Sequence, residues 1–151
     1  SVDIWGAHTG LSHSNLARDL AQSLHAISNK GVTGIQLIGH SQGGAITASA
    51  LRYASTAGLN LNALSSGGVA LHGAPINAWL ARSKLIDIES ASIVSRAQFG
   101  DAVHVLGGLN VKNPIEVVIS VIRSPALFSS DISVSPHSLP CAGKTSMMFG
   151  Y

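Results

Sequence analysis

Apolar residues recur along the chain with a helical period in its first third. Leu16, Leu20, Leu24 and Ile27 repeat at a spacing that places them on one face of a helix. Ser14 or Asn15 suits the N-cap of this helix, and the run Asn29-Lys30-Gly31 supplies its C-terminal stop. Further helices are expected over residues 43–57, ended by Gly58, and over the shorter stretch 78–85.

Short apolar runs lie between these helical stretches and predict β-strands. The expected strands cover residues 2–5, 35–38, 69–71, 92–95 and 115–122. The last is the strongest because it is rich in Val and Ile, and 92–95 is the weakest. Residues 6–14, between the first strand and the first helix, are expected to form a loop. Strands that alternate with helices predict an α/β fold around a parallel sheet, in one domain over residues 1–151.

Composition narrows the classes of function. Apolar residues make up 46% of the chain and charged residues 11%, which predicts a well-filled core and excludes disorder. The net charge is only +2 and basic residues form no cluster, so nucleic-acid binding is not expected. Cys141 is the single cysteine, so no internal disulfide can form. No apolar run reaches the length of a membrane span.

The segment Gly39-His40-Ser41-Gln42-Gly43 carries the clearest chemistry. It follows an apolar strand and precedes a helix, so that Ser41 is expected on a sharp, strained turn with its hydroxyl above the sheet. Gly39 and Gly43 are expected to avoid collisions between strand and helix. The helix beginning after Ser41 presents unpaired N–H groups, of which that of Gln42 can stabilise an oxyanion.

This segment, with Leu37, Ile38 and Gly44 around it, closely resembles the nucleophile elbow of α/β-hydrolase lipases and esterases. The resemblance covers most of the chain, from about Ser14 to His137, although only the elbow is highly specific. It implies a three-layer α/β-hydrolase core with Ser41 as nucleophile. It also implies the order of the remaining catalytic groups: an acid after a later strand and a histidine after the last one.

Asp101 is the expected catalytic acid. It follows the strand 92–95, and Gly100-Asp101-Ala102-Val103 looks like the acid-bearing segment of many lipases. Asp87 comes before that strand, and Asp131 comes too close to the candidate histidine for the family's order. A solvated turn aspartate is the alternative interpretation of Asp101.

His137 is the expected base among seven histidines. It lies between Pro136 and Pro140 in a loop after the strand 115–122, from which it could reach Ser41 while Asp101 orients it. His104 is the runner-up, and an ordinary surface histidine is the alternative. His72 ends a strand and could line the pocket, whereas His8, His13 and His25 have no catalytic argument.

The chain departs from the family's pattern before the elbow, where it has room for only one strand. The strand whose loop normally carries the second oxyanion donor is therefore either missing, or its role passes to the expected loop Gly6-Ala7-His8-Thr9-Gly10, in which Gly6 and Ala7 are the candidate donors. The chain is interpreted as a minimal hydrolase or the C-terminal part of a larger one. A group of apolar residues after the third expected strand would form either a small apolar flap over the site or a core-packed helix. These residues are Ile76, Trp79, Leu80, Leu85 and Ile86.

These residues predict a serine hydrolase acting on carboxylic esters, as a lipase, esterase or phospholipase, through Ser41, His137 and Asp101. Thioesterase, acyltransferase and peptidase activities use the same site and stay open. The alternative is an inactive binding or assembly module of a larger secreted bacterial protein. No cofactor or metal is expected, since no His-Glu-x-x-His or Cys-x-x-Cys pattern occurs. The expected partner is a small-molecule or lipid ester, with transient membrane-surface contact and a secreted or exported location.

Overall fold

A computed structural model describes residues 2–77, 92–98, 118 and 148–150 of the chain. The elements follow one another as α1 (Val2–Thr9), α2 (Asn15–Asn29), β1 (Gln36–His40), α3 (Gln42–Thr56), a short 3-10 helix η1 (Asn62–Leu64), β2 (Gly68–His72), β3 (Ser92–Gln98) and β4 (Met148–Gly150). Helices and strands alternate through this part of the chain, and the fold class is α/β as predicted.

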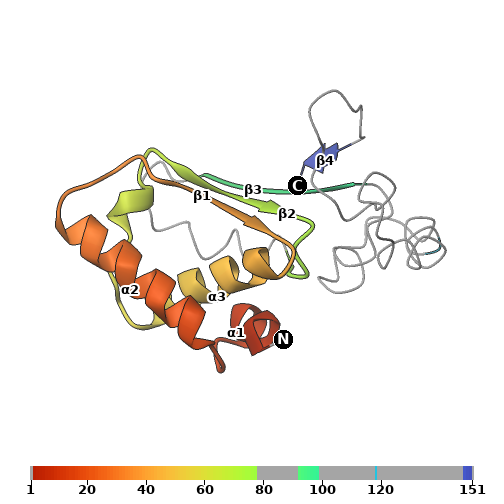
Figure 1. Ribbon diagram of the computed structural model, residues 1–151, viewed down its shortest axis with the longest axis horizontal. Helices are drawn as coiled ribbons and strands as arrows, with labels where there is room; N and C mark the ends of the chain where they lie inside the picture. The colour runs from red at the N-terminus through yellow and green to blue at the C-terminus, as the bar shows by residue number, and fades with distance from the viewer. Residues whose placement is uncertain (1, 78–91, 99–117, 119–147, 151) are drawn as a thin grey trace.

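The described strands form one sheet in the order β1-β2-β3-β4 (Figure 1). The first three strands are parallel, which confirms the predicted parallel sheet. β4 runs antiparallel to β3 and was not predicted. Leu37, Val69 and Ile93 pair across the three parallel strands, and Gly39, Leu71 and Ser95 pair two residues further along. Because side chains alternate along a strand, these six residues lie on one face of the sheet.

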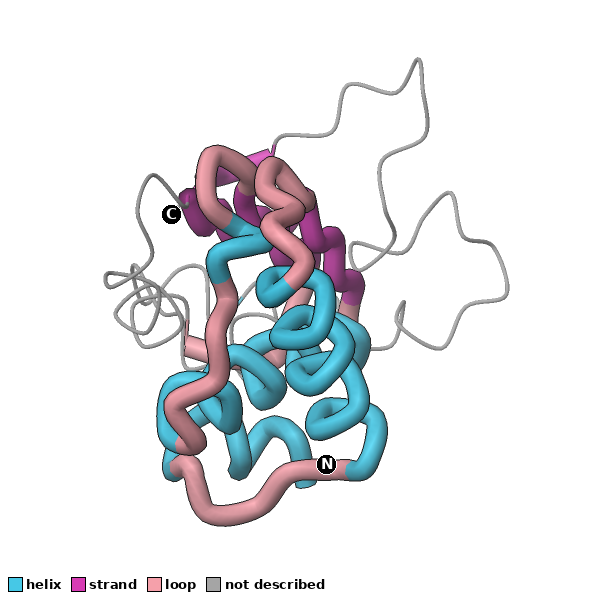
Figure 2. Tube along the Cα trace, turned by 90° about the vertical axis from the view of Figure 1, so that its left-hand side faces the viewer, coloured by secondary structure: helices cyan, strands magenta, loops and turns pink. Residues whose placement is uncertain are grey.

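Helices α1, α2 and α3 lie together on one side of the strands in both views (Figures 1 and 2). α3 packs directly on β1, and both α1 and α2 pack on α3. The core between them is built of small and branched side chains, among which Leu51, Leu64, Leu71 and Ile76 are fully buried. In the described part of the chain the molecule is therefore a sheet with one helical layer, and the described residues form no third layer of the kind that the family resemblance implies.

Helix α2 begins where the sequence predicts, and its buried face overlaps the predicted one only in part. Ser14 is its N-cap, with a side chain that accepts a hydrogen bond from Ala17 N. The buried positions of the helix are Ala17, Ala21, Leu24 and Ser28, whereas Leu16 is 66% exposed. The expected apolar stripe is confirmed at Leu24, which is buried, and at Leu20, which is partly buried and packs against the core, but it is wrong at Leu16. Ala17 and Ala21, which are both fully buried, extend the buried face beyond the predicted leucines.

Residues 2–5 form the first turn of α1, so the expected strand is wrong, and the expected loop at 6–14 is wrong over residues 6–9 but confirmed over residues 10–14. Val, Ile and Trp favour strands locally, but tertiary contacts override that preference. Asp3 lies in the first helical turn, where a carboxylate interacts favourably with the helix dipole. Asp3 is buried and its Oδ1 accepts a hydrogen bond from Ser14 N at 3.0 Å. This bond ties the start of α1 to the N-cap of α2.

The other expected elements have mixed outcomes. The strands at 69–71 and 92–95 are confirmed and extended as β2 and β3, and the helix at 43–57 is confirmed as α3. The strand at 35–38 is confirmed as β1, but its expected burial was wrong, since Ile38 is 70% exposed on the face turned away from the helices.

Two expected elements lie wholly or mostly outside the described residues. The helix at 78–85 cannot be compared with the structure. Within 115–122 only Val118 is described, and its backbone is helical, so the strand is wrong at that residue. β-propensity reflects packing on a pleated surface, and it did not set the conformation there. None of the described helices is long and apolar enough to cross a membrane.

The cap of α2 gives a first prediction. Ser14→Ala removes the acceptor for Ala17 N–H and should lower the free energy of unfolding by about 1 kcal/mol. Urea unfolding followed by circular dichroism measures the change. Ser23→Ala is the control, because Ser23 is exposed in the middle of the same helix. An equal loss in both variants would contradict the capping role.

Candidate active site

Ser41 joins the end of β1 to the start of α3. Its backbone N–H donates to His72 O at 2.9 Å, which continues the pairing of β1 with β2. Its carbonyl accepts hydrogen bonds from Gly44 N at 3.0 Å and Ala45 N at 3.3 Å, the first bonds of the helix. Ser41 is thus held from both sides by backbone bonds at the carboxyl end of the strand, which is where ligand sites of parallel sheets lie.

The backbone of Ser41 is strained. Its φ of 53° and ψ of −123° fall outside the small left-handed region that residues with a side chain can adopt. A serine before a helix normally caps it, but the side chain of Ser41 makes no capping hydrogen bond. The hydroxyl is half-exposed and is not used to stabilise the helix. The strained turn expected from the sequence is therefore present.

The three glycines of this turn differ in how much space a side chain would have at each position. A Cβ on Gly39 would lie 2.7 Å from Gly44 Cα, so strand and helix approach too closely for any side chain there. A Cβ on Gly44 would lie 2.5 Å from the Cβ of Ala74, in the segment after β2. A Cβ on Gly43 would meet no atom within 4 Å. Gly39 has the role predicted for it, but the second crowded position is Gly44 and not Gly43.

Gln42 is the first residue of α3, and its side chain is exposed. The N–H groups of the first helical turn have no acceptor within the helix, and they form its positive dipole end. The Gln42 N–H comes directly after Ser41 at this helix end, where an N–H group can donate to the oxyanion that forms on a carbonyl attacked by the Ser41 hydroxyl.

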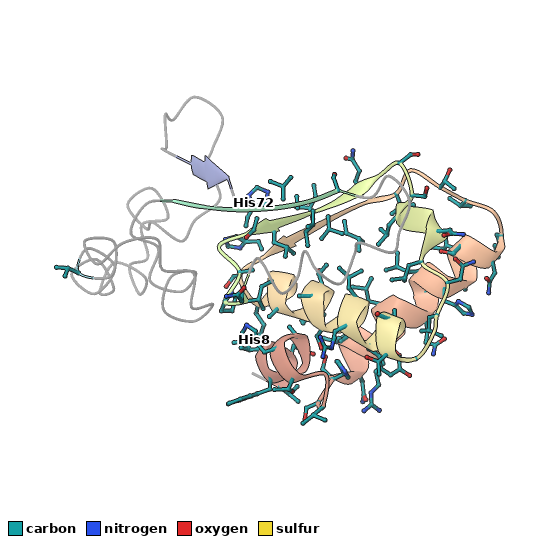
Figure 3. All side chains as sticks on the ribbon, turned by 180° about the vertical axis from the view of Figure 1, so that it is seen from behind. His8 and His72 are labelled. Carbon is teal, nitrogen blue, oxygen red and sulfur yellow. The ribbon has the colours of Figure 1, made fainter. Side chains whose placement is uncertain are left out.

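His72 ends β2 beside the elbow, as predicted. It pairs in register with His40, and both lie on the face of the sheet turned away from the helices, since Gly39 and Leu71 face α3. Figure 3 shows His72 on the strand layer and His8 on α1 below it. The placement of His72 in the wall of a substrate pocket stays a prediction.

Gly6 and Ala7 are buried within α1, not on an open loop. A Cβ on Gly6 would collide with the backbone oxygen of Ser12 and would lie 2.7 Å from Ser49 Oγ, so Gly6 allows α1 to pack closely on the loop that follows it and on α3. Backbone N–H groups beyond the first helical turn bond to the preceding turn. Gly6 and Ala7 were expected to donate to the oxyanion from a loop. Because they lie within a helix, this prediction loses its structural reason.

His8, on α1, contacts the segment that follows β2, and nothing in the sequence indicates this contact. Its Nε2 accepts a hydrogen bond from Asn77 N at 2.9 Å, between residues 69 positions apart. Burial lowers the pKa of His8 below its ordinary value of 6.5. The neutral ring is required by the contact as well, because a backbone N–H can only donate.

The lowered pKa of His8 predicts a pH-dependent stability. Because the unfolded chain binds a proton at His8 more readily than the folded chain, the contribution is complete above pH 6.5 and is lost as the pH falls from there through the folded pKa. His8→Gln should remove this component while keeping an acceptor. Urea unfolding of both proteins between pH 7.5 and about pH 5 measures the difference. Parallel pH curves would contradict the prediction.

The other predicted site residues lie outside the described residues. These are Asp101 and His137, together with Asp87, His104, Asp131, Trp79, Leu80, Leu85 and Ile86. Ile76 is described and is 1% exposed in the core, so at this residue the core interpretation holds and the flap interpretation is wrong. In the described part of the chain, no three His, Cys, Asp or Glu side chains gather closely enough to hold a metal ion.

Comparison of the chain with protein-family models, with curated proteins and with solved structures found no match. The geometry around Ser41 and the Gly-x-Ser-x-Gly pattern at residues 39–43 are therefore the observations that bear on function.

Proposed function

We propose that this chain is a serine hydrolase that cleaves carboxylic esters, built on an α/β-hydrolase core. The observation that carries the proposal is the backbone of Ser41, whose φ of 53° and ψ of −123° place a half-exposed, non-capping serine between a parallel strand and a helix. Strained backbone of this kind persists where the surrounding structure over-determines it, and it gathers at active sites. Gly39 and Gly44 provide that surrounding at the elbow.

The proposed reaction has two halves. Ser41 Oγ attacks the acyl carbonyl while His137 takes the hydroxyl proton, and the Gln42 N–H donates to the oxyanion that forms. The carbon–oxygen bond to the leaving alcohol breaks as His137 returns the proton to it. Water then attacks the acyl-enzyme, again with His137 as base, and releases the acid and free Ser41. Asp101 orients His137. The roles of Asp101 and His137 come from the sequence pattern alone.

The substrate is proposed to be a small-molecule or lipid ester. Support comes from the low charge of the chain and from the elbow at residues 39–43, which contains no Asp, Glu, Lys or Arg. A charged substrate group would find no fixed partner in this stretch of sequence.

The test is hydrolysis of p-nitrophenyl esters from acetate to palmitate by the full chain, with labelling by a fluorophosphonate as a second readout. Turnover, with the label recovered on the peptide containing Ser41, is the expected result. The chain length that is cleaved fastest separates an esterase from a lipase. A folded protein that neither turns over esters nor takes up the label would overturn the proposal and favour an inactive module.

A further inference from the structure

A side-chain hydrogen bond between His8 and Asn77 joins α1 to the segment that follows β2. His8 Nε2 accepts from Asn77 N at 2.9 Å, and burial around His8 keeps the ring neutral by lowering its pKa. Replacing His8 with a side chain that cannot accept would remove this half-buried hydrogen bond, and a lost hydrogen bond of that kind costs stability. The bond therefore ties the segment after β2 to α1.

The segment between β2 and this contact lies against the elbow. Residues 73–76 are all buried, with Ala74 at 0% and Ile76 at 1% exposure. Ala74 is so close to the first turn of α3 that Gly44 has no room for a Cβ. At its other end, His72 accepts the N–H of Ser41. The segment is thus bonded to the nucleophile at its start, packed on the elbow helix in its middle and held by His8 at its end.

We propose that His8 is a positioning residue, which holds residues 73–77 against the first turn of α3 and so keeps Ser41 in its reactive backbone conformation. The proposal rests on the proposed serine hydrolase function, since its consequence is the reactivity of Ser41. His8 acts through Asn77 and Ala74 and does not touch substrate. A displacement of about 1 Å at a nucleophile lowers reaction rates by up to about 100-fold, so a distant support can matter.

The charged and titratable groups on the elements around His8 are few, and Asp3 and His13 form hydrogen bonds with residues other than His8. On α1 itself the carboxylate of Asp3 accepts from Ser14 N. His13, after α1, shares a hydrogen bond with Ser49 Oγ at 2.8 Å. α3, the helix that packs on α1, carries Arg52 and Tyr53, and residues 73–77 carry no titratable side chain.

The experiment compares His8→Leu, His8→Gln and His25→Leu with the wild-type full chain. His25 is the matched control, because it too is half-buried and accepts a backbone N–H, from Asn60 at 2.9 Å, but from α2. The rate of Ser41 labelling by the fluorophosphonate is measured beside kcat and KM for the best ester. His8→Leu should lower kcat and the labelling rate by about 10- to 100-fold with KM little changed. His8→Gln and His25→Leu should stay near wild type.

A readout that needs no activity separates the two proposals. In ¹⁵N NMR the Asn77 amide should follow the titration of His8 in the wild type and lose that dependence in His8→Gln. Equal labelling in His8→Leu and His25→Leu, or an Asn77 amide that does not respond to pH, overturns the positioning role. A wild type that is not labelled, with Asn77 still responding, supports the contact but overturns the hydrolase and the catalytic consequence of His8.

Discussion

Ser41→Ala should lower ester hydrolysis by between about 10⁴- and 10⁶-fold, the range expected when a nucleophile is removed from a catalytic triad. The fold should be kept, because alanine and serine meet the same steric conflict at a φ of 53°. Ester turnover and the urea midpoint of the two proteins are measured together. A variant that retains turnover would show that another residue attacks the ester.

Ser41→Gly separates the backbone strain at position 41 from the loss of the nucleophilic hydroxyl. It should be as inactive as Ser41→Ala, yet more stable than Ser41→Ala by about 1 kcal/mol, since glycine adopts positive φ without a steric conflict. Ser66→Gly is the control, because Ser66 also has a positive φ, of 59°, but is exposed in a turn at the other end of β2. It should alter stability and leave ester turnover unchanged. Equal stabilities of the two Ser41 variants would contradict strain at the elbow.

Local signals in the sequence were sufficient for the elbow and for the elements that flank it. Gly39 and Ser41 sit between an apolar run and a helical run, so both their place and the strain at Ser41 could be predicted. Ser14 likewise has the side chain that an N-cap needs, directly before a helical pattern. In each case the deciding interaction spans only a few residues.

Contacts between distant parts of the chain could not be read in the same way. Val2, Ile4 and Trp5 favour a strand by their own preference, and the helix there depends on Asp3 reaching Ser14 and on packing against α3. His8 offered no signal at all, because its partner Asn77 is 69 positions away. The pair Gly43-Gly44 could be expected to allow close packing, but the sequence does not show that only Gly44 is crowded, because its neighbour Ala74 lies in the distant segment after β2.

The close approach of β1 to α3 gives the prediction with the second largest effect. A Cβ on Gly39 would lie 2.7 Å from Gly44 Cα, 2.9 Å from Gly44 N and 3.0 Å from Gly43 O. All three atoms belong to the helix backbone, which cannot yield as a flexible side chain would. Gly39→Ala must therefore push the first turn of α3 away from the strand, and Ser41 lies between the two.

We expect Gly39→Ala to lower the free energy of unfolding by about 2 to 3 kcal/mol, as overpacking of a close contact does. Because the nucleophile moves with the helix, ester turnover in the folded protein should also fall by about 100-fold. Gly43→Ala is the stability control two residues beyond Ser41: its Cβ meets open space, and alanine favours a helix over glycine by up to about 1 kcal/mol. Urea unfolding should therefore move in opposite directions for the two variants. A Gly39→Ala protein as stable as Gly43→Ala would mean that β1 and α3 do not meet as closely as the elbow requires, and the strained conformation of Ser41 would lose its structural cause.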